Sequence, residues 1–75
     1  MKQWDGVKVI KIDANDTSKG IQLGWIGTII KGSGVKHVYF PQWQGWNKKP
    51  NIGEDGIDTD KIWFMNTFQL EVVDD

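Results

Sequence analysis

The chain has 75 residues, of which 39% are apolar, enough to form the core of one small domain but not of a second. Nine lysines and no arginine face ten acidic residues, so the net charge is −1, whereas general nucleic-acid-binding proteins carry a clear basic excess. The lack of cysteine excludes disulfides, cysteine-based zinc sites and thiol catalysis. The charges of Lys2 and Asp5 near the start and the short apolar runs lead us to expect a soluble, cytoplasmic protein without a membrane segment.

The composition predicts an all-β chain. Valine, isoleucine and threonine number nineteen, whereas alanine, leucine and glutamate number five. β-branched side chains fit a pleated surface and lose rotamer freedom in a helix. Nine glycines and two prolines also interrupt the chain too often for a helix longer than about two turns.

The first half of the chain predicts three strands. The first covers residues 7–12, where a break in the apolar alternation suggests a bulge or a strand buried on both faces. Residues 13–24 form a loop rich in turn formers. The second and third strands, residues 25–31 and 35–40, are joined by a tight Gly32-Ser33-Gly34 connection, and Pro41 ends the third.

The second half predicts one long loop and two further strands. Residues 42–60 show no sustained period, and connections of this length inside compact domains are usually functional or disordered. Strand pattern resumes at residues 62–65, followed by a short turn at Asn66-Thr67 and a last strand in which Phe68, Leu70 and Val72 alternate with polar residues. The acidic end, residues 73–75, is expected to fray.

These elements predict a single domain over residues 1–75, with its core in residues 6–73: a five-stranded SH3-like small barrel with a long loop, residues 42–60, between strands three and four. Closing the sheet removes most of the exposed strand edge that a small open sheet leaves. An OB-fold also has five strands, but it often has a helix between its third and fourth strands, and residues 42–60 are a poor helix.

Several short motifs carry a family resemblance. They are Gly6-Val7-Lys8-Val9, Gly24-x-x-Gly27-Thr28-Ile29-Ile30, Val38-Tyr39-Phe40, and Ile62-Trp63-Phe64 followed by Leu70-Glu71-Val72-Val73. This pattern resembles SH3-like small-barrel proteins, especially small uncharacterised proteins of tailed bacteriophages, and its glycine turn is similar to that of KOW-type nucleic-acid modules. The resemblance implies a phage-encoded protein in the host cytoplasm; its motifs specify a fold and not an activity.

An aromatic segment, residues 39–50, is the strongest functional signal. Four aromatic residues within eight positions are typical of a face on which a base, a sugar or a proline ring stacks. The predicted partner-binding residues are Tyr39, Trp43, Trp46 and Asn47. The competing interpretation is that Phe40 and one tryptophan close the core and fix the loop. Trp4 and Trp25 are assigned to packing or to a partly exposed edge.

Charge is unevenly distributed. Residues 1–49 carry eight lysines and three aspartates, a balance of +5, and residues 50–75 carry one lysine and seven acids, a balance of −6. The lysines that form a candidate nucleic-acid contact are Lys31, Lys36, Lys48 and Lys49, with His37 beside them and with Trp43 and Trp46 as stacking platforms. Ordinary solvated charges explain the same residues, and arginine, which gives bidentate phosphate and guanine contacts, is absent.

Four acids in residues 54–60 offer enough oxygen ligands for Ca²⁺ if the loop closes around it, but their order does not match an EF-hand, and a solvated acidic turn is the favoured interpretation. His37 lies within a strand, and neither serine has a base beside it, so no catalytic constellation, metal site or cofactor site is predicted.

The sequence therefore predicts a non-enzymatic interaction module that binds a host or phage protein through an aromatic face. The alternatives are a weak single-stranded nucleic-acid binder and a structural or assembly component.

Overall fold

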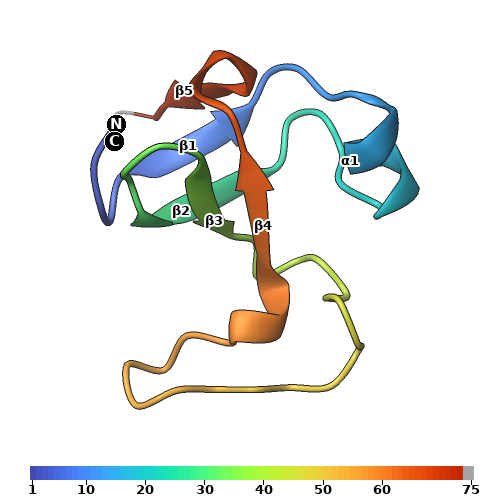
Figure 1. Ribbon diagram of the computed structural model, residues 1–75, viewed down its shortest axis with the longest axis vertical. Helices are drawn as coiled ribbons and strands as arrows, with labels where there is room; N and C mark the ends of the chain where they lie inside the picture. Colours follow the sequence, from blue (N-terminus) through green and yellow to red (C-terminus); the bar gives the residue numbers. More distant parts are fainter. Residues whose placement is uncertain (74–75) are drawn as a thin grey trace.

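The computed structural model describes residues 1–73 and contains five strands, one short helix and two 3₁₀ turns (Figure 1). The elements in chain order are β1 (Gly6–Val9), α1 (Ala14–Ser18), β2 (Ile26–Lys31), β3 (Lys36–Tyr39), η1 (Thr59–Lys61), β4 (Ile62–Met65), η2 (Thr67–Gln69) and β5 (Leu70–Val72). This confirms the predicted all-β class. Asp74 and Asp75, part of the end expected to fray, lie outside the described residues.

The strands form one antiparallel sheet in the order β4-β3-β2-β1-β5. The first four strands pair as consecutive neighbours, and β5 returns to the free side of β1, with Val7 opposite Val72. Within residues 1–73, no ladder joins the two edge strands β4 and β5. The sheet therefore has five antiparallel strands, as predicted, and its hydrogen-bonded ladder does not close.

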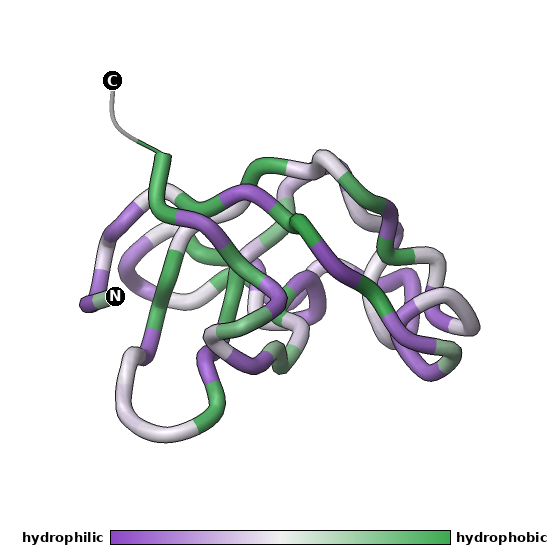
Figure 2. The backbone as a smooth tube through the Cα atoms, turned by 90° about the horizontal axis from the view of Figure 1, so that it is seen from above, coloured by the Kyte–Doolittle hydropathy of each residue, from purple (hydrophilic) through white to green (hydrophobic). Residues whose placement is uncertain are grey.

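The core is built from the alternate side chains of the strands, because successive residues of a strand point to opposite faces. Figure 2 shows hydrophobic and hydrophilic stretches alternating along the backbone instead of gathering in one segment. The buried apolar residues are Val7, Val9, Ile21, Ile29, Val38, Phe40, Trp43, Trp63, Met65 and Leu70. Trp43 comes from the long loop, so this loop contributes to the core as well as to the surface.

The first predicted strand is too long, and the loop after it contains a helix. β1 ends at Val9, and beyond it the chain turns toward α1. Asp13 caps α1: its carboxylate accepts from the backbone N–H of Asp16 at 2.9 Å, and the Asp16 carboxylate accepts from the N–H of Asp13 at 3.1 Å. This reciprocal capping box satisfies two backbone donors, which explains a helical turn among residues that favour loops.

Two further predictions are corrected. The bulge lies between β2 and β3, where the register shifts between Ile29 and Lys31, and not in the first strand. The last strand begins at Leu70 and not at Phe68, because η2 occupies the three residues before it. Phe68 is consequently 65% exposed, although its place in the apolar alternation predicts burial.

Residues 42–60 form a wide arc below β4, drawn from yellow to orange in Figure 1. The prediction of a loop without a sustained element holds up to η1, and one isolated bridge pairs Ile52 with Asp58. Two buried aspartates organise this segment. The Asp58 carboxylate accepts from the backbone N–H groups of Asn51 at 2.9 Å and Asp60 at 3.0 Å.

Asp60 holds the preceding turn in the same way. Its carboxylate accepts from the backbone N–H groups of Asn47 at 3.0 Å and Lys49 at 3.3 Å, while its carbonyl accepts from the N–H of Trp46 at 2.9 Å. Gly45 adopts a φ of 94°, and a Cβ at this position would collide with the Asp60 carboxylate. Only glycine therefore lets the chain pass this close to Asp60.

Candidate aromatic interaction surface

Three aromatic side chains lie together at the β4 edge, two of them on the outer face of the sheet and the third beside the strand. His37 on β3 is directly opposite Phe64 on β4, and their ring centroids are 4.7 Å apart in an edge-to-face arrangement. Trp46, from the long loop, lies with its centroid 6.1 Å from that of Phe64. We call His37, Phe64 and Trp46 the aromatic strip. Phe64 is 46% exposed and Trp46 is 42% exposed, so the strip presents ring surface outward.

Trp46 is held against the free edge of β4. The backbone N–H of Phe40 donates to the carbonyl of Lys61 at 3.0 Å, which continues the β3–β4 register. The pair of Phe40 and Lys61 is therefore hydrogen-bonded. Because hydrogen-bonded and non-hydrogen-bonded pairs alternate in an antiparallel ladder, the backbone N–H and C=O groups of Ile62 and Phe64 point away from β3. Nε1 of Trp46 donates to the carbonyl of Ile62 at 2.7 Å. This side chain therefore covers part of an edge that is otherwise open to pairing with another chain.

The ring of Trp46 also rests on the core. Its centroid is 4.9 Å from that of Trp63 and 5.9 Å from that of Trp43, and both of these rings are buried. Together with its backbone and indole hydrogen bonds, these contacts fix the orientation of the side chain. A surface ring held in one orientation loses little conformational entropy when a partner binds.

A lysine lies at each end of the strip. Nζ of Lys19 lies over the ring of Trp46, 5.3 Å from its centroid, which is the distance of a cation–π contact. At the other end, exposed Lys31 on β2 is the cross-strand partner of His37. Directly opposite residues share one face of a sheet, so Lys31, His37 and Phe64 follow one another across the outer face. The row then continues around the β4 edge through Trp46, which also contacts buried Trp63, to Lys19.

The predicted partner-binding residues do not form one surface. Trp46 and Asn47 are exposed and Tyr39 is half-buried on the outer face of β3. Trp43 is only 2% exposed, and its Nε1 donates to the carbonyl of Lys19 at 2.7 Å. Together with fully buried Phe40, this ring closes the core. Trp43 therefore has the structural role that the competing interpretation gave to one tryptophan of this segment.

The predicted nucleic-acid lysines are also separated. Lys31, Lys48 and Lys49 are exposed, but Lys36 is buried and its Nζ donates to the carbonyl of Gly32. A buried ammonium that is already hydrogen-bonded is not available to a phosphate. The four lysines therefore do not present one continuous basic face.

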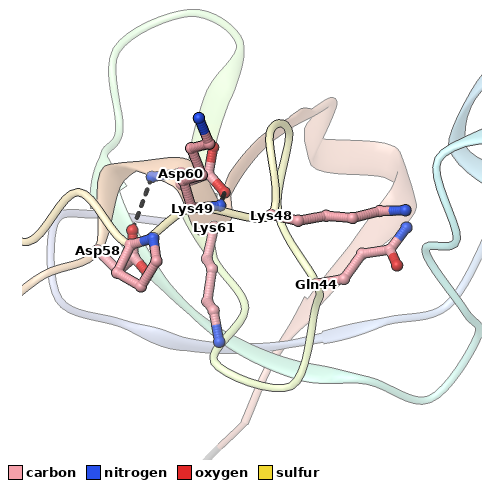
Figure 3. Close-up of a pocket in the computed structure, with 7 residues that line it drawn as sticks. Gln44, Lys48, Lys49, Asp58, Asp60 and Lys61 are labelled. Carbon is pink, nitrogen blue, oxygen red and sulfur yellow. Dashed lines mark hydrogen bonds between the residues drawn. The ribbon is translucent and has the colours of Figure 1, made fainter.

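A small cavity of about 180 Å³ lies at the long loop and is lined by Gln44, Lys48, Lys49, Pro50, Asp58, Asp60 and Lys61. In Figure 3, Lys48 extends beside Gln44, whereas Lys61 points in a different direction, and Nζ of Lys61 donates to the carbonyl of Pro41 at 3.0 Å. The ammonium groups of these two lysines do not converge on one point, which an anion site built from them requires. The residues that line the cavity therefore do not indicate a ligand for it.

The acidic stretch is not a solvated turn throughout. Asp58 and Asp60 are each 7% exposed, and their carboxylates accept the backbone hydrogen bonds described above. Within residues 1–73, no group of three or more histidine, cysteine, aspartate or glutamate side chains is placed to hold a metal ion. The carboxylates of these two aspartates are therefore used in hydrogen bonds within the loop.

His37 and Phe64 are the members of the strip that the aromatic segment did not predict. The expected outward position of His37 on its strand is confirmed. Phe64 lies in an unbroken apolar run, residues 62–65, in which its neighbours Trp63 and Met65 are buried; only the register of β4 shows that it faces out.

The two tryptophans assigned to packing or to a partly exposed edge differ in exposure. Trp4 is 55% exposed, and Trp25 packs against the core with its ring centroid 5.8 Å from that of Phe40.

Comparison with protein-family models, curated protein sequences and solved structures finds no match for the chain. Among residues 1–73, none of the helices has the length and apolar character needed to cross a membrane.

Proposed function

We propose that this chain is a non-enzymatic protein-interaction module with SH3-like architecture, and that it binds a partner protein through the aromatic strip and the adjoining part of residues 42–60. The observation that carries the proposal is the strip itself: Phe64 on β4 and Trp46 beside the edge of the same strand are both exposed, with their ring centroids 6.1 Å apart. Aromatic rings fixed in this way are typical anchors of protein interfaces.

The connections between the strands support the SH3-like architecture. A long connection follows β1, a tight one joins β2 to β3, a second long one follows β3, and a 3₁₀ turn leads into β5. On the resemblance of its motifs, we also propose that the chain is phage-encoded and that its partner is a host or phage protein.

Nucleic-acid binding is the weaker alternative. Trp43 and Lys36, two members of the proposed contact, are buried, and the chain has a net charge of −1. The chain also has no arginine, the residue that gives bidentate phosphate contacts.

Site-specific photocrosslinking tests the proposal in cells that produce the protein. A photoreactive phenylalanine analogue replaces Phe64 in one variant and Phe68 in the control. Phe68 is a matched position because it is exposed and has Nζ of Lys11 over its ring at 5.7 Å, yet it lies outside the strip. We expect a protein that is crosslinked from position 64 and not from position 68. The same products from both positions, or none from position 64, would contradict the proposal.

A further inference from the structure

The charges around the aromatic strip indicate which kind of partner it fits. We propose that the occupant is an acidic peptide segment, in which an apolar or aromatic side chain contacts Phe64 and Trp46 and carboxylates on both sides of it meet Lys19 and Lys31. This inference rests on the proposed function and adds the chemistry of the partner.

The geometry sets the length of the segment. The row from Lys31 through His37 to Phe64 crosses three adjacent strands, which lie about 4.8 Å apart. Trp46 extends the row by 6.1 Å between ring centroids, and Nζ of Lys19 lies 5.3 Å from the Trp46 centroid. The path along the row is therefore at most about 20 Å, which corresponds to about six residues of an extended peptide or fewer.

The sign of the charge favours an acidic occupant. Both ends of the row carry an exposed lysine. Of the four carboxylates in the neighbouring loop, those of Asp58 and Asp60 are buried and each accepts two backbone hydrogen bonds, whereas Glu54 and Asp55 are exposed. The row thus presents positive charge around an apolar centre, and complementary charges steer and orient a partner at the rim of an interface.

The packing of Trp46 favours a peptide over single-stranded nucleic acid. A base stacks on an open ring face, but the Trp46 ring already packs against Trp63 and has the Lys19 ammonium over it. An apolar side chain needs only the exposed part of Trp46 and the adjacent surface of Phe64.

Selection from a random peptide library tests the inference directly. The library displays peptides of about seven residues, long enough to cover the row, and the full chain is immobilised. We expect the enriched peptides to carry a large apolar or aromatic residue with aspartate or glutamate on both sides. Peptides enriched without this acidic flanking, or no enrichment at all, would overturn the inference, as would tighter binding of a short oligothymidine than of any selected peptide.

Lysine variants then test the two ends of the row. For a selected peptide, we expect Lys19→Gln combined with Lys31→Gln to weaken the Kd about 5- to 10-fold at low salt, and this difference to disappear at about 0.5 M salt. The control, Lys8→Gln combined with Lys11→Gln, removes the same charge outside the row and should leave the Kd within about twofold of the wild type. Equal weakening by both pairs would overturn the inference.

The two proposals fail in different ways. A partner that is crosslinked from position 64, but whose affinity for the protein does not change in the Lys19→Gln/Lys31→Gln variant, removes the acidic-peptide assignment and leaves the proposed function intact. The absence of any product specific to position 64 removes the proposed function itself. Matching urea-unfolding midpoints for all the variants show that each of them is folded.

Discussion

Nε1 of Trp63 donates a hydrogen bond of 2.7 Å to Oδ1 of Asp16, which joins β4 to α1 across 47 positions of sequence. Oδ2 of Asp16 accepts from Nε2 of Gln69 at 2.7 Å and from the backbone N–H of Asp13 at 3.1 Å. Asp16 and Gln69 are each 3% exposed. One buried carboxylate thus fixes the helix, β4 and the turn before β5 to one another.

Asp16→Ala is expected to destabilise the fold by about 2 to 4 kcal/mol, because it leaves the Trp63 indole N–H and the Gln69 amide buried without their acceptor. Urea unfolding followed by tryptophan fluorescence measures the change. Asn15→Ala, an exposed position in the same helix, is the control and should change stability by less than about 0.5 kcal/mol. Equal stability of the two variants would show that the buried carboxylate does not join these elements.

Asp60→Asn tests whether Asp60 organises the long loop. The substitution keeps the shape of the side chain but replaces one acceptor oxygen with a donor that faces a backbone N–H. We expect a loss of about 1 to 3 kcal/mol and faster hydrogen exchange at the amides of Asn47 and Lys49. Glu54→Gln, on the exposed tip of the same loop, should change neither. Unaltered protection of both amides in Asp60→Asn would contradict this role.

Gly27→Ala tests the close packing of β2 on β3. An added Cβ would lie 2.7 Å from Cγ1 of Val38 and 2.8 Å from the carbonyl oxygen of Tyr39, so the strands must shift apart. The expected cost is about 1 to 3 kcal/mol, measured by thermal or urea unfolding. Gly32→Ala is the control because its added Cβ has no neighbour closer than 3.4 Å. If Gly32→Ala costs as much as Gly27→Ala, close packing at position 27 is not the cause.

Trp46→Ala tests the covering of the β4 edge. The variant loses the hydrogen bond to the carbonyl of Ile62 and the contact with Trp63, and we expect a destabilisation of about 1 to 3 kcal/mol. It also exposes the backbone groups of a strand edge, so sedimentation should reveal self-association that increases with concentration. Trp4→Ala, which removes another exposed indole, should sediment as the wild type does. A Trp46→Ala protein that is as stable as the wild type and does not self-associate would exclude this role.

The class of fold and the approximate place of each strand could be predicted from composition and apolar alternation. The β4 prediction, residues 62–65, has the observed bounds. The short helix could not be predicted by these means, because it depends on the reciprocal contact of Asp13 and Asp16, two residues that also favour loops. The alternation of Phe68, Leu70 and Val72 was misleading because η2 takes Phe68 out of the sheet.

The surface could be predicted only in part. The predicted aromatic segment, residues 39–50, contains both Trp43 and Trp46, but composition does not distinguish Trp43, which enters the core, from Trp46, which stays on the edge. Phe64 joins the strip through strand register, and Lys19 joins it by folding back from the end of α1 over Trp46. The acidic residues of the loop were expected to be solvated, but Asp58 and Asp60 are buried. They turn inward because their carboxylates accept hydrogen bonds from backbone N–H groups.

Phe64 provides the most direct test of the central claim, that the aromatic strip is a protein-binding surface. The measurement is the Kd of the purified crosslinked partner for the wild type, Phe64→Ser and Phe68→Ser, by isothermal titration. We predict that Phe64→Ser weakens binding by about tenfold or more, as expected for an interface anchor, while Phe68→Ser binds as the wild type does. Equal affinities for Phe64→Ser and the wild type, with both proteins folded, would contradict the claim.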